Sequence, residues 1–353
     1  MGFENNIRKV IPYVPGEQPR NKVIKLNTNE CPYPPSPKVK EALSNADWER
    51  LRLYPDPVCD SLVSAIADHY GVSKDETFVG VGSDDVLSMC FLTYFAGNKP
   101  VLFPDITYSF YDVWTEVYRI PYEKKPLRSD FSIDPEDYFG DNGGVVIANP
   151  NAPTGVEASL YTIREILEHN KNSVVIADEA YIDFGGETAL PLIREYDNLV
   201  VVRTMSKSRA LAGMRIGYCF GNARLIKYLN DVKYSVNSYT MNMPALIAGK
   251  AAIEDKEYFE ETVGKVIKTR EWTAGELKKL GFTFNDSKAN FIFAKPPAPV
   301  KAGELFKRLK QNDIYVRYFD KPLINGYLRI SIGTDEEMKI FTDTLKRLME
   351  ELC

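Results

Sequence analysis

Histidine is scarce in this chain of 353 residues, where it occurs as His69 and His169 alone. Neither histidine stands beside a metal-ligating or catalytic-triad residue, so both are interpreted as structural or surface residues. We therefore predict no metal site and no Ser-His-Asp hydrolase. Any acid–base chemistry should fall to lysine, aspartate, tyrosine or cysteine side chains.

Paired cysteines, long apolar runs and basic blocks are also missing. The net charge is −5 with no long run of one sign, which argues against a nucleic-acid surface. Apolar runs such as SVVIA and NLVVV are too short to cross a bilayer, and the N-terminal MGFENNIRKV lacks the apolar core of a signal peptide. We therefore expect a cytoplasmic protein that binds neither nucleic acid nor membrane. The scattered cysteines lack C-x-x-C spacing and are typical of free thiols in a reducing cytosol: Cys31, Cys59, Cys90, Cys219 and Cys353.

The order of apolar patterns predicts two α/β domains. Between residues 60 and 220, short Val- and Ile-rich runs alternate with helical patterns, which favours strands buried on both faces of a parallel sheet. After Gly221 the pattern is mostly helical and leads into a smaller α/β region, with a helical segment at 255–280 as the bridge. Proline-rich stretches near the start indicate an extended N-terminal arm. The predicted division is an arm at 1–45 that joins the small domain, a large domain at 46–254 and a small domain at 255–353.

Four of the predicted strands end in polar, chemically reactive residues. Ligands of open parallel sheets bind at the carboxyl ends of the strands, so these four ends should meet at one site. The four stretches are VGVGSDDVL, ANPNAPTG, SVVIADEAY and VVRTMSKSRALAGMRIGY.

Three of the stretches also have simpler interpretations. Gly82-Ser83-Asp84 could bind a phosphate at a helix start or act only as an N-cap, and Asp85 occupies the third glycine position of a dinucleotide fingerprint. The stretch with Asn149 and Asn151 could be only a tight turn. Asp178 could be a helix cap, although a carboxylate that closes a buried strand needs a partner.

Lys207 is the most informative residue because it directly follows a buried strand. An ordinary lysine is protonated and a poor nucleophile at neutral pH, whereas desolvation or a neighbouring cation frees its amine for Schiff-base chemistry. A solvated surface lysine is the alternative. The strand end and the surrounding Thr204, Ser206 and Arg215 argue against that alternative.

Together the four strand ends fit pyridoxal phosphate, whose protein partners are a Schiff-base lysine and an acid at the ring nitrogen. The expected partners are Gly82-Ser83-Asp84, Ser206 and Arg215 for the phosphate, Lys207 for the carbonyl, Asp178 for the pyridinium nitrogen, and Tyr181 with an asparagine for the phenolate oxygen.

The chain also resembles the fold type I pyridoxal-phosphate aminotransferases, and among them most closely the histidinol-phosphate aminotransferases. ADEAY together with SKxxxLAGxRxGY is highly specific for the superfamily, and the family order holds from about residue 10 onward. The resemblance implies a large, mostly parallel-sheet α/β domain that binds the cofactor and a smaller α/β domain. The matching stretches are LNTNECPYPPSP, LYPDP, VGSDDVL, PDITYSFY, NPNAPTG, ADEAYIDF, TMSKSRALAGMRIGY, NFIFA and YLRISIG.

The resemblance assigns roles to individual residues. Lys207 would form the Schiff base and shuttle the proton, Asp178 would pair with the ring nitrogen, and Tyr181 with the phenolate oxygen. A homodimer is implied, because Tyr54 would reach into the neighbouring subunit's site. Tyr108 would stack on the ring. The other implied contacts are Ser83, Asp84, Asn151, Thr204, Ser206 and Arg215 with the cofactor, and Tyr13, Asn29, Glu30, Arg317 and Arg329 with the substrate.

Two positions depart from the family pattern. The family has an asparagine directly before Pro-Thr-Gly, which bonds the phenolate oxygen, whereas this chain has Ala152. Asn151 would take that role through a shifted turn, or Tyr181 would act alone. Arg209 often has an uncharged counterpart in the family and is interpreted as a surface residue.

The implied reaction is transamination of L-histidinol phosphate with 2-oxoglutarate, which yields imidazole acetol phosphate and glutamate in histidine biosynthesis. Arg329 would bind the carboxylate of glutamate or the phosphate of histidinol phosphate, and Arg317 and Tyr13 would help to hold that phosphate. An aromatic amino-acid aminotransferase and a threonine-phosphate decarboxylase are alternatives, because they share most of these motifs. A remote alternative is a pyridoxal-phosphate-binding regulatory module, judged from the fold alone.

Overall fold

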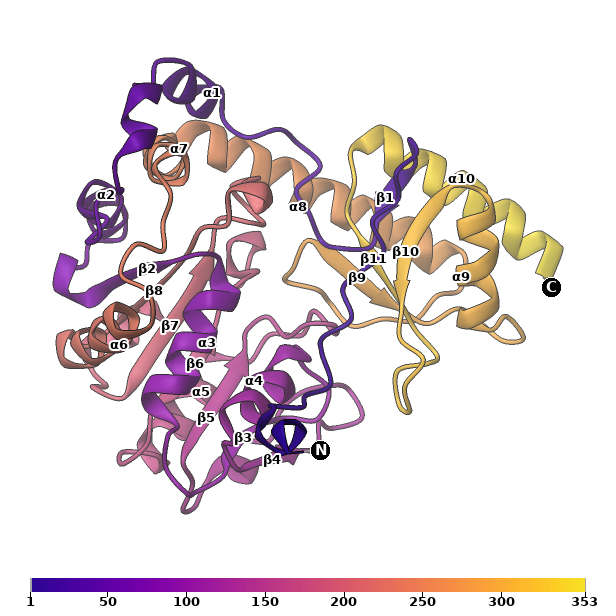
Figure 1. Cartoon of the computed structure of the whole chain (residues 1–353). Coiled ribbons are helices and arrows are strands. Elements are labelled where there is room, and N and C mark those ends of the chain that lie inside the picture. Colours follow the sequence, from indigo (N-terminus) through magenta and orange to yellow (C-terminus); the bar gives the residue numbers. More distant parts are fainter. Residues whose placement is uncertain (1, 353) are drawn as a thin grey trace.

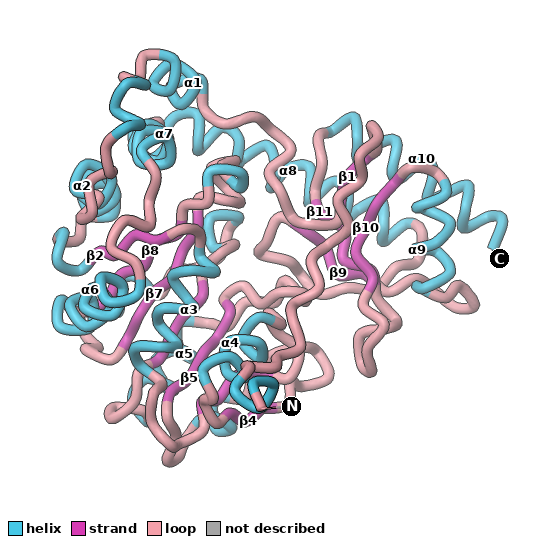
Figure 2. Tube along the Cα trace, in the orientation of Figure 1, coloured by secondary structure: helices cyan, strands magenta, loops and turns pink. Residues whose placement is uncertain are grey.

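The chain forms a larger and a smaller α/β unit, which lie side by side in Figures 1 and 2. The computed structural model describes residues 2–352, so Cys353 lies outside the described residues, and the other four cysteines are free thiols. Helix α8 (Lys256–Lys279) runs from the larger unit along the smaller one, in the segment expected to join them (Figure 1). The predicted α/β architecture, with a large and mostly parallel sheet and a smaller α/β unit, is confirmed.

A seven-stranded sheet forms the centre of the larger unit, in the order β2-β8-β7-β6-β5-β3-β4. Strands β3 to β7 pair in parallel, whereas β8 is antiparallel to both β7 and β2. Strand β2 therefore points the same way as β7, and the carboxyl ends of all strands except β8 lie at one edge. The strands are β2 (Thr77–Gly80), β3 (Val101–Pro104), β4 (Tyr122–Lys125), β5 (Gly144–Ala148), β6 (Val175–Asp178), β7 (Leu199–Thr204) and β8 (Gly217–Gly221).

Helices cover both faces of this sheet, which explains the continuous Val and Ile runs. Every residue of β5, β6 and β7 is buried. Helices α2, α5 and α7 contribute to the core on one face, and α3, α4 and α6 to the core on the other. The helices of this unit are α1 (Pro37–Ser44), α2 (Asp60–Tyr70), α3 (Ser83–Tyr94), α4 (Phe110–Tyr118), α5 (Leu160–His169), α6 (Ala223–Val236) and α7 (Met243–Glu254).

The smaller unit is a four-stranded sheet that packs on α8 and two further helices. Its order is β1-β10-β11-β9, and its core includes the predicted apolar stripe Met338, Phe341, Leu345 and Leu348 of the last helix. The predicted capping box of that helix is present, since the Thr334 amide donates to Glu337 Oε2 at 2.8 Å and the Glu337 amide to Thr334 Oγ1 at 3.2 Å. The elements are β1 (Ile24–Leu26), β9 (Phe291–Ala294), β10 (Ile314–Tyr318), β11 (Leu328–Ser331), α9 (Ala302–Gln311) and α10 (Asp335–Leu352).

The chain also forms short 3₁₀ turns between its helices and strands. No helix within residues 2–352 combines the length and the apolar character that a bilayer crossing requires. The 3₁₀ turns are Phe3–Asn6, Trp48–Arg52, Lys74–Glu76, Pro135–Tyr138, Ile182–Phe184, Leu190–Arg194 and Ala212–Met214.

The N-terminal segment contacts both units (Figure 1). Tyr13 stacks on Phe110 of α4, with ring centroids 4.2 Å apart. Strand β1 then pairs in parallel with β10 of the small sheet. Helix α1 returns to the larger unit, where Val39 joins the same core as α7. The domain division at residues 45 and 254 stays a prediction, and this path favours an arm that ends before α1.

Candidate active site

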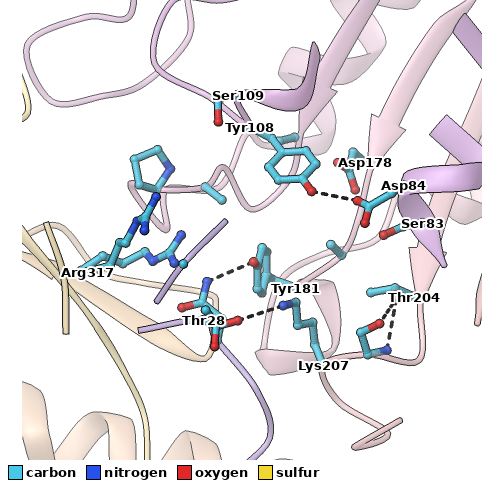
Figure 3. Close-up of a pocket in the computed structure, with 18 of the residues that line it drawn as sticks. Thr28, Ser83, Asp84, Tyr108, Ser109, Asp178, Tyr181, Thr204, Lys207 and Arg317 are labelled. Carbon is cyan, nitrogen blue, oxygen red and sulfur yellow. Dashed lines mark hydrogen bonds between the residues drawn. The ribbon is translucent and has the colours of Figure 1, made fainter. Parts of the chain in front are cut away.

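A cavity of about 240 Å³ lies at the carboxyl edge of the large sheet, where the smaller unit and the N-terminal segment face it (Figure 3). Residues from both units and from the N-terminal segment line it, although they are far apart in the sequence. Tyr54 and Asn151 are not among the described residues that line it. The predicted site residues that do are Tyr13, Asn29, Glu30, Ser83, Asp84, Tyr108, Asp178, Tyr181, Thr204, Ser206, Lys207, Arg215, Arg317 and Arg329.

Lys207 lies on the loop that follows β7. Its Nζ donates to the backbone carbonyl of Thr28 at 3.2 Å and lies 5.6 Å from the centre of the Tyr181 ring. Figure 3 shows the amine turned toward the cavity, opposite Asp178. The Thr28 carbonyl was not anticipated from the sequence, because a main-chain acceptor carries no residue-type signal. The lysine is thus directed into the cavity and is not a solvated surface residue.

Asp178 is the last residue of β6 and is buried. Its Oδ2 accepts a hydrogen bond of 2.7 Å from the Tyr111 hydroxyl, whereas its Oδ1 has no partner among the described residues. Burial raises the pKa of the Asp178 carboxyl to about 6, although the Tyr111 hydroxyl and the Ala180 amide act in the opposite direction. A buried carboxylate oxygen without a donor is costly. The pyridinium N–H of the predicted cofactor would satisfy it, so Asp178 fits that group.

The turn between β2 and α3 forms one side of an anion site. Gly82 has φ +86°, and a Cβ there would come within 2.5 Å of Arg215 Nη2, so glycine lets the guanidinium lie against the turn. Arg215 Nη2 pairs with Asp84 Oδ2 at 3.0 Å, and its Nη1 lies 3.5 Å from Ser206 Oγ. The N-terminus of the twelve-residue helix α3 adds the positive end of its dipole. This donor set fits the phosphate of pyridoxal phosphate.

The other hydroxyls of this corner are held in defined positions. Thr204 Oγ1 donates to Ser206 Oγ at 3.0 Å and accepts from the Ser206 amide at 3.1 Å. The Tyr108 hydroxyl donates to Asp84 Oδ1 at 2.8 Å (Figure 3). Burial and the Asp84 carboxylate raise the pKa of Tyr108 well above its ordinary value, so this phenol stays protonated.

Asn29 connects the smaller unit to Tyr181. Its Nδ2 donates to the Tyr181 hydroxyl at 3.0 Å. Its amide N–H and its Oδ1 bond Ser331 Oγ of β11 at 3.0 and 2.8 Å, and its carbonyl accepts from Asn290. Asn29 has φ +56°, a left-handed conformation that asparagine adopts more readily than most residues. An amide donor therefore reaches the Tyr181 oxygen from Asn29, and not from the turn after β5.

Asn151 is directed away from the cavity. Its Nδ2 donates to the Ile106 carbonyl at 2.9 Å and to Thr154 Oγ1 at 3.0 Å, and its Oδ1 accepts from Thr107 Oγ1 at 2.8 Å. The side chain is buried and fixes the loop that precedes Tyr108, while Ala152 lines the cavity. The structure does not bring Asn151 into the place that the shifted-turn hypothesis gave it.

Two arginines face the cavity from the small sheet. Arg317 of β10 and Arg329 of β11 are directly paired in the antiparallel register, and their guanidinium carbons lie 5.3 and 5.6 Å from the centre of the Phe319 ring. Arg317 Nη2 donates to the backbone carbonyl of Val14 at 3.4 Å, and Arg329 Nη2 donates to that of Asn27 at 2.9 Å. Like charges opposite one another on neighbouring strands repel, so an anionic ligand between them would be stabilising.

Glu30 lies on the cavity wall within a small polar cluster. Its carboxylate pairs with Lys25 and accepts from Thr28 Oγ1 at 2.7 Å. Burial alone would raise the pKa of Glu30, but the hydrogen bonds from Lys25 and Thr28 lower it below its ordinary value. Glu30 thus presents a negative charge near Lys207.

Tyr54 lies outside the cavity of its own chain. It is 81% exposed and stacks on Tyr239 with ring centroids 4.6 Å apart. Its predicted place in a neighbouring subunit's site stays a prediction.

The interpretation of Arg209 as a surface residue is wrong. The side chain is buried, its Nη1 donates to the Ala252 carbonyl, and its Nη2 lies 3.2 Å from His69 Nε2. Its guanidinium carbon also lies 4.1 Å from the centre of the Phe259 ring. The loop that carries Lys207 is thereby fastened to α2, α7 and α8. None of these partners is near Arg209 in sequence, so no local pattern indicated them.

Comparisons with known proteins agree with this geometry. The sequence profile of the family "Aminotransferase class I and II" matches residues 21–345. A histidinol-phosphate aminotransferase of Clostridium botulinum (strain Okra / Type B1) is 53% identical over 351 residues, which are 99% of each chain. One from Lactococcus lactis subsp. cremoris (strain SK11) is 50% identical, over 99% of this chain and 98% of its own.

A solved structure shows the same fold. The histidinol-phosphate aminotransferase of Sinorhizobium meliloti, in complex with pyridoxal-5'-phosphate, superposes with a TM-score of 0.85 at 24% identity. The match covers 94% of this chain and 92% of that one. The chain is therefore a pyridoxal-phosphate-dependent enzyme that belongs to the class I and II aminotransferases and, within them, to the histidinol-phosphate aminotransferases.

Proposed function

We propose that the protein transfers the amino group of L-histidinol phosphate to 2-oxoglutarate and so produces imidazole acetol phosphate and glutamate, a step of histidine biosynthesis. The observation that carries this proposal is the cross-strand pair of Arg317 and Arg329, which faces the same cavity as Lys207 and Asp178. Two adjacent cations suit the two negative charges of a phosphate monoester.

Pyridoxal phosphate, when bound, supplies a ring that accepts the electrons released at the substrate carbon. In this proposal, Arg215, Ser206 and the start of α3 would hold its phosphate, and Tyr108 would cover the ring. Asp178 would keep the ring nitrogen protonated through its unpartnered Oδ1. Tyr181 would bond the phenolate oxygen, and the Asn29 amide, which donates to the Tyr181 hydroxyl, would orient it.

Lys207 would hold the cofactor and move the proton. Its hydrogen bond to the Thr28 carbonyl and its position beside the Tyr181 ring keep the amine within the cavity. In the substrate complex, the Lys207 amine would act as a general base toward the substrate carbon and would return the proton as an acid.

The substrate phosphate would lie at the small-sheet end of the cavity, between Arg317, Arg329 and Tyr13. Tyr13 is held there by its stack on Phe110. Glutamate and 2-oxoglutarate would place a carboxylate at Arg329 in the same space, so one site serves both half-reactions. Glu30 would lie near the substrate.

We further propose that the protein works in the cytoplasm as a homodimer with shared active sites. The segment around Tyr54 exposes several large apolar side chains close together in the sequence, which favours a partner subunit on this surface. These side chains are Trp48, Leu51, Leu53, Tyr54 and Val58.

A panel of amino donors tests the substrate. The purified, cofactor-loaded protein is assayed with 2-oxoglutarate and histidinol phosphate, phenylalanine or threonine phosphate. We expect kcat/KM for histidinol phosphate to exceed that for phenylalanine by about 100-fold or more. This ratio corresponds to the free energy of the one or two charge-assisted hydrogen bonds that phenylalanine, which has no phosphate, cannot form. Phenylalanine as the best donor would support an aromatic aminotransferase instead, and CO₂ release from threonine phosphate would support a decarboxylase.

A further inference from the structure

We propose that Tyr111 is a positioning residue of the active site, whose hydroxyl orients the Asp178 carboxylate and keeps it ionised. The proton that this carboxylate shares with the cofactor's ring nitrogen then remains on the nitrogen. Tyr111 is not among the described residues that line the cavity, so it acts through Asp178 and not on the substrate. The inference rests on the proposed role of Asp178 at the ring nitrogen.

Tyr111 is held rigidly. It belongs to α4, and its side chain is completely buried. Its ring lies 5.7 to 6.2 Å, between centroids, from those of Phe91, Phe103, Tyr108 and Trp114. From this position its hydroxyl reaches Asp178 Oδ2 at 2.7 Å. A donor fixed by four aromatic neighbours holds the carboxylate plane with little loss of side-chain entropy on binding.

The two oxygens of Asp178 have different surroundings. Oδ2 is engaged by Tyr111, whereas the buried Oδ1 has no partner within residues 2–352. Figure 3 shows Asp178 at the cavity wall, near Tyr108 and Asp84. Because Oδ2 accepts the hydrogen bond from Tyr111, rotation of the carboxylate would break that bond. The free oxygen is therefore presented to the cavity in one orientation.

The charges around Asp178 make this bond important. Burial and two neighbouring carboxylates, Asp84 of α3 and the adjacent Glu179, raise the proton affinity of Asp178, while the Tyr111 hydroxyl and the Ala180 amide lower it. Tyr181 and Lys207 also face the cavity. Burial and the Asp178 carboxylate raise the pKa of Tyr111 well above its ordinary value, so it remains a donor at any working pH.

Loss of the Tyr111 hydroxyl would leave Asp178 a stronger base. A proton shared between a carboxylate and a pyridine nitrogen then moves toward the carboxylate, and the ring loses the positive charge that stabilises electrons arriving from the substrate. Phenylalanine would fill the same volume, so the hydroxyl and not the ring carries the effect.

Tyr138 offers a matched control. It is a completely buried tyrosine whose hydroxyl has no partner in the described part of the chain. Tyr138→Phe and Tyr111→Phe each remove one buried oxygen from a core position, but Tyr111→Phe alone removes a hydrogen bond to Asp178.

The first measurement uses the full-length protein freed of cofactor. Infrared spectra follow the protonated carboxyl band of Asp178 with pH, assigned by its loss in Asp178→Asn. Tyr111→Phe should raise the midpoint of the Asp178 titration by about one to two pH units, which corresponds to the free energy of a hydrogen bond to a charged group. Tyr138→Phe should leave this midpoint unchanged. 3-Fluorotyrosine at position 111, a stronger donor, should lower it. An unchanged midpoint in Tyr111→Phe, or an equal rise in Tyr138→Phe, would overturn the proposal.

The second measurement uses the cofactor-loaded enzyme. Tyr111→Phe should lower kcat at least about tenfold with little change in KM, and should shift the pH titration of the bound cofactor's absorbance. In an Asp178→Asn background Tyr111→Phe should have no further effect, whereas an undiminished effect there would contradict the proposal. The apoprotein titration needs neither donor nor cofactor, so a different amino donor would refute the proposed function and leave that result standing.

Discussion

The buried ion pair between Arg203 and Glu179 lies directly behind the site. Arg203 precedes Thr204 at the end of β7, and Glu179 follows Asp178 at the end of β6. Arg203 Nη2 and Nε lie 2.9 and 3.1 Å from Glu179 Oε2, and both side chains are at most 5% exposed. The pair therefore fixes the relative positions of the two strand ends that carry Asp178 and Lys207.

Arg203→Met should be strongly destabilising. It leaves the Glu179 carboxylate buried with only the Ala189 amide and the Thr188 hydroxyl as donors. Removing one partner of a buried ion pair costs about 3–5 kcal/mol, whereas replacing both partners by apolar residues is often neutral. The double variant Arg203→Met/Glu179→Met should thus recover part of the lost free energy of unfolding. The recovery should be incomplete, because Asp183 also loses its ion pair with Arg203 Nη1, at 3.3 Å.

Urea unfolding followed by circular dichroism measures these free energies. The exposed pair of Arg164 and Glu195 provides the control, since Arg164→Met should leave the unfolding midpoint near that of the wild type. A loss below about 1 kcal/mol for Arg203→Met, or no recovery in the double variant, would refute the reasoning.

Three further changes have defined outcomes. Arg317→Met should raise KM for histidinol phosphate about 10- to 100-fold and leave KM for unphosphorylated donors nearly unchanged, which steady-state kinetics would measure. Gly82→Ala forces a side chain into a backbone with φ +86° and against Arg215, so the Kd of pyridoxal phosphate should rise at least about tenfold, while unphosphorylated pyridoxal, titrated by absorbance, should be less affected. Burial and Arg209 lower the pKa of His69 from 6.5 to about 4, so folding stability should fall as pH drops from 6.5 toward 4, because the unfolded chain takes up the proton first. His69→Gln, which keeps an acceptor for Arg209, should flatten that part of the stability–pH curve.

The strand ends of the site could be predicted because their signal is local. Asp178 and Lys207 each follow a buried run of Val and Ile, and in a sheet of parallel strands such ends meet at one edge whatever the strand order. The arginine pair was expected only from the family resemblance, and the register of β10 with β11 places Arg317 opposite Arg329.

Other features depend on contacts that no local pattern encodes. Tyr111 is 67 positions from Asp178 in the sequence, and its hydroxyl finds the carboxylate only through the packing of α4 on the sheet. Arg209 lies on the loop after β7 and is buried by partners on the helices α2, α7 and α8, among them His69 and Phe259. The direction of Asn151 is set by the turn geometry around Thr107, which a residue type does not specify.

Covalent trapping of the cofactor tests the central claim most directly. The loaded enzyme is reduced with borohydride, digested and examined by peptide mass spectrometry. We predict that the pyridoxyl group is found on Lys207, and that Lys207→Ala abolishes both the label and turnover. A label on another lysine, such as Lys25, which pairs with Glu30 of the cavity wall, or transamination at a normal rate by Lys207→Ala, would contradict the account.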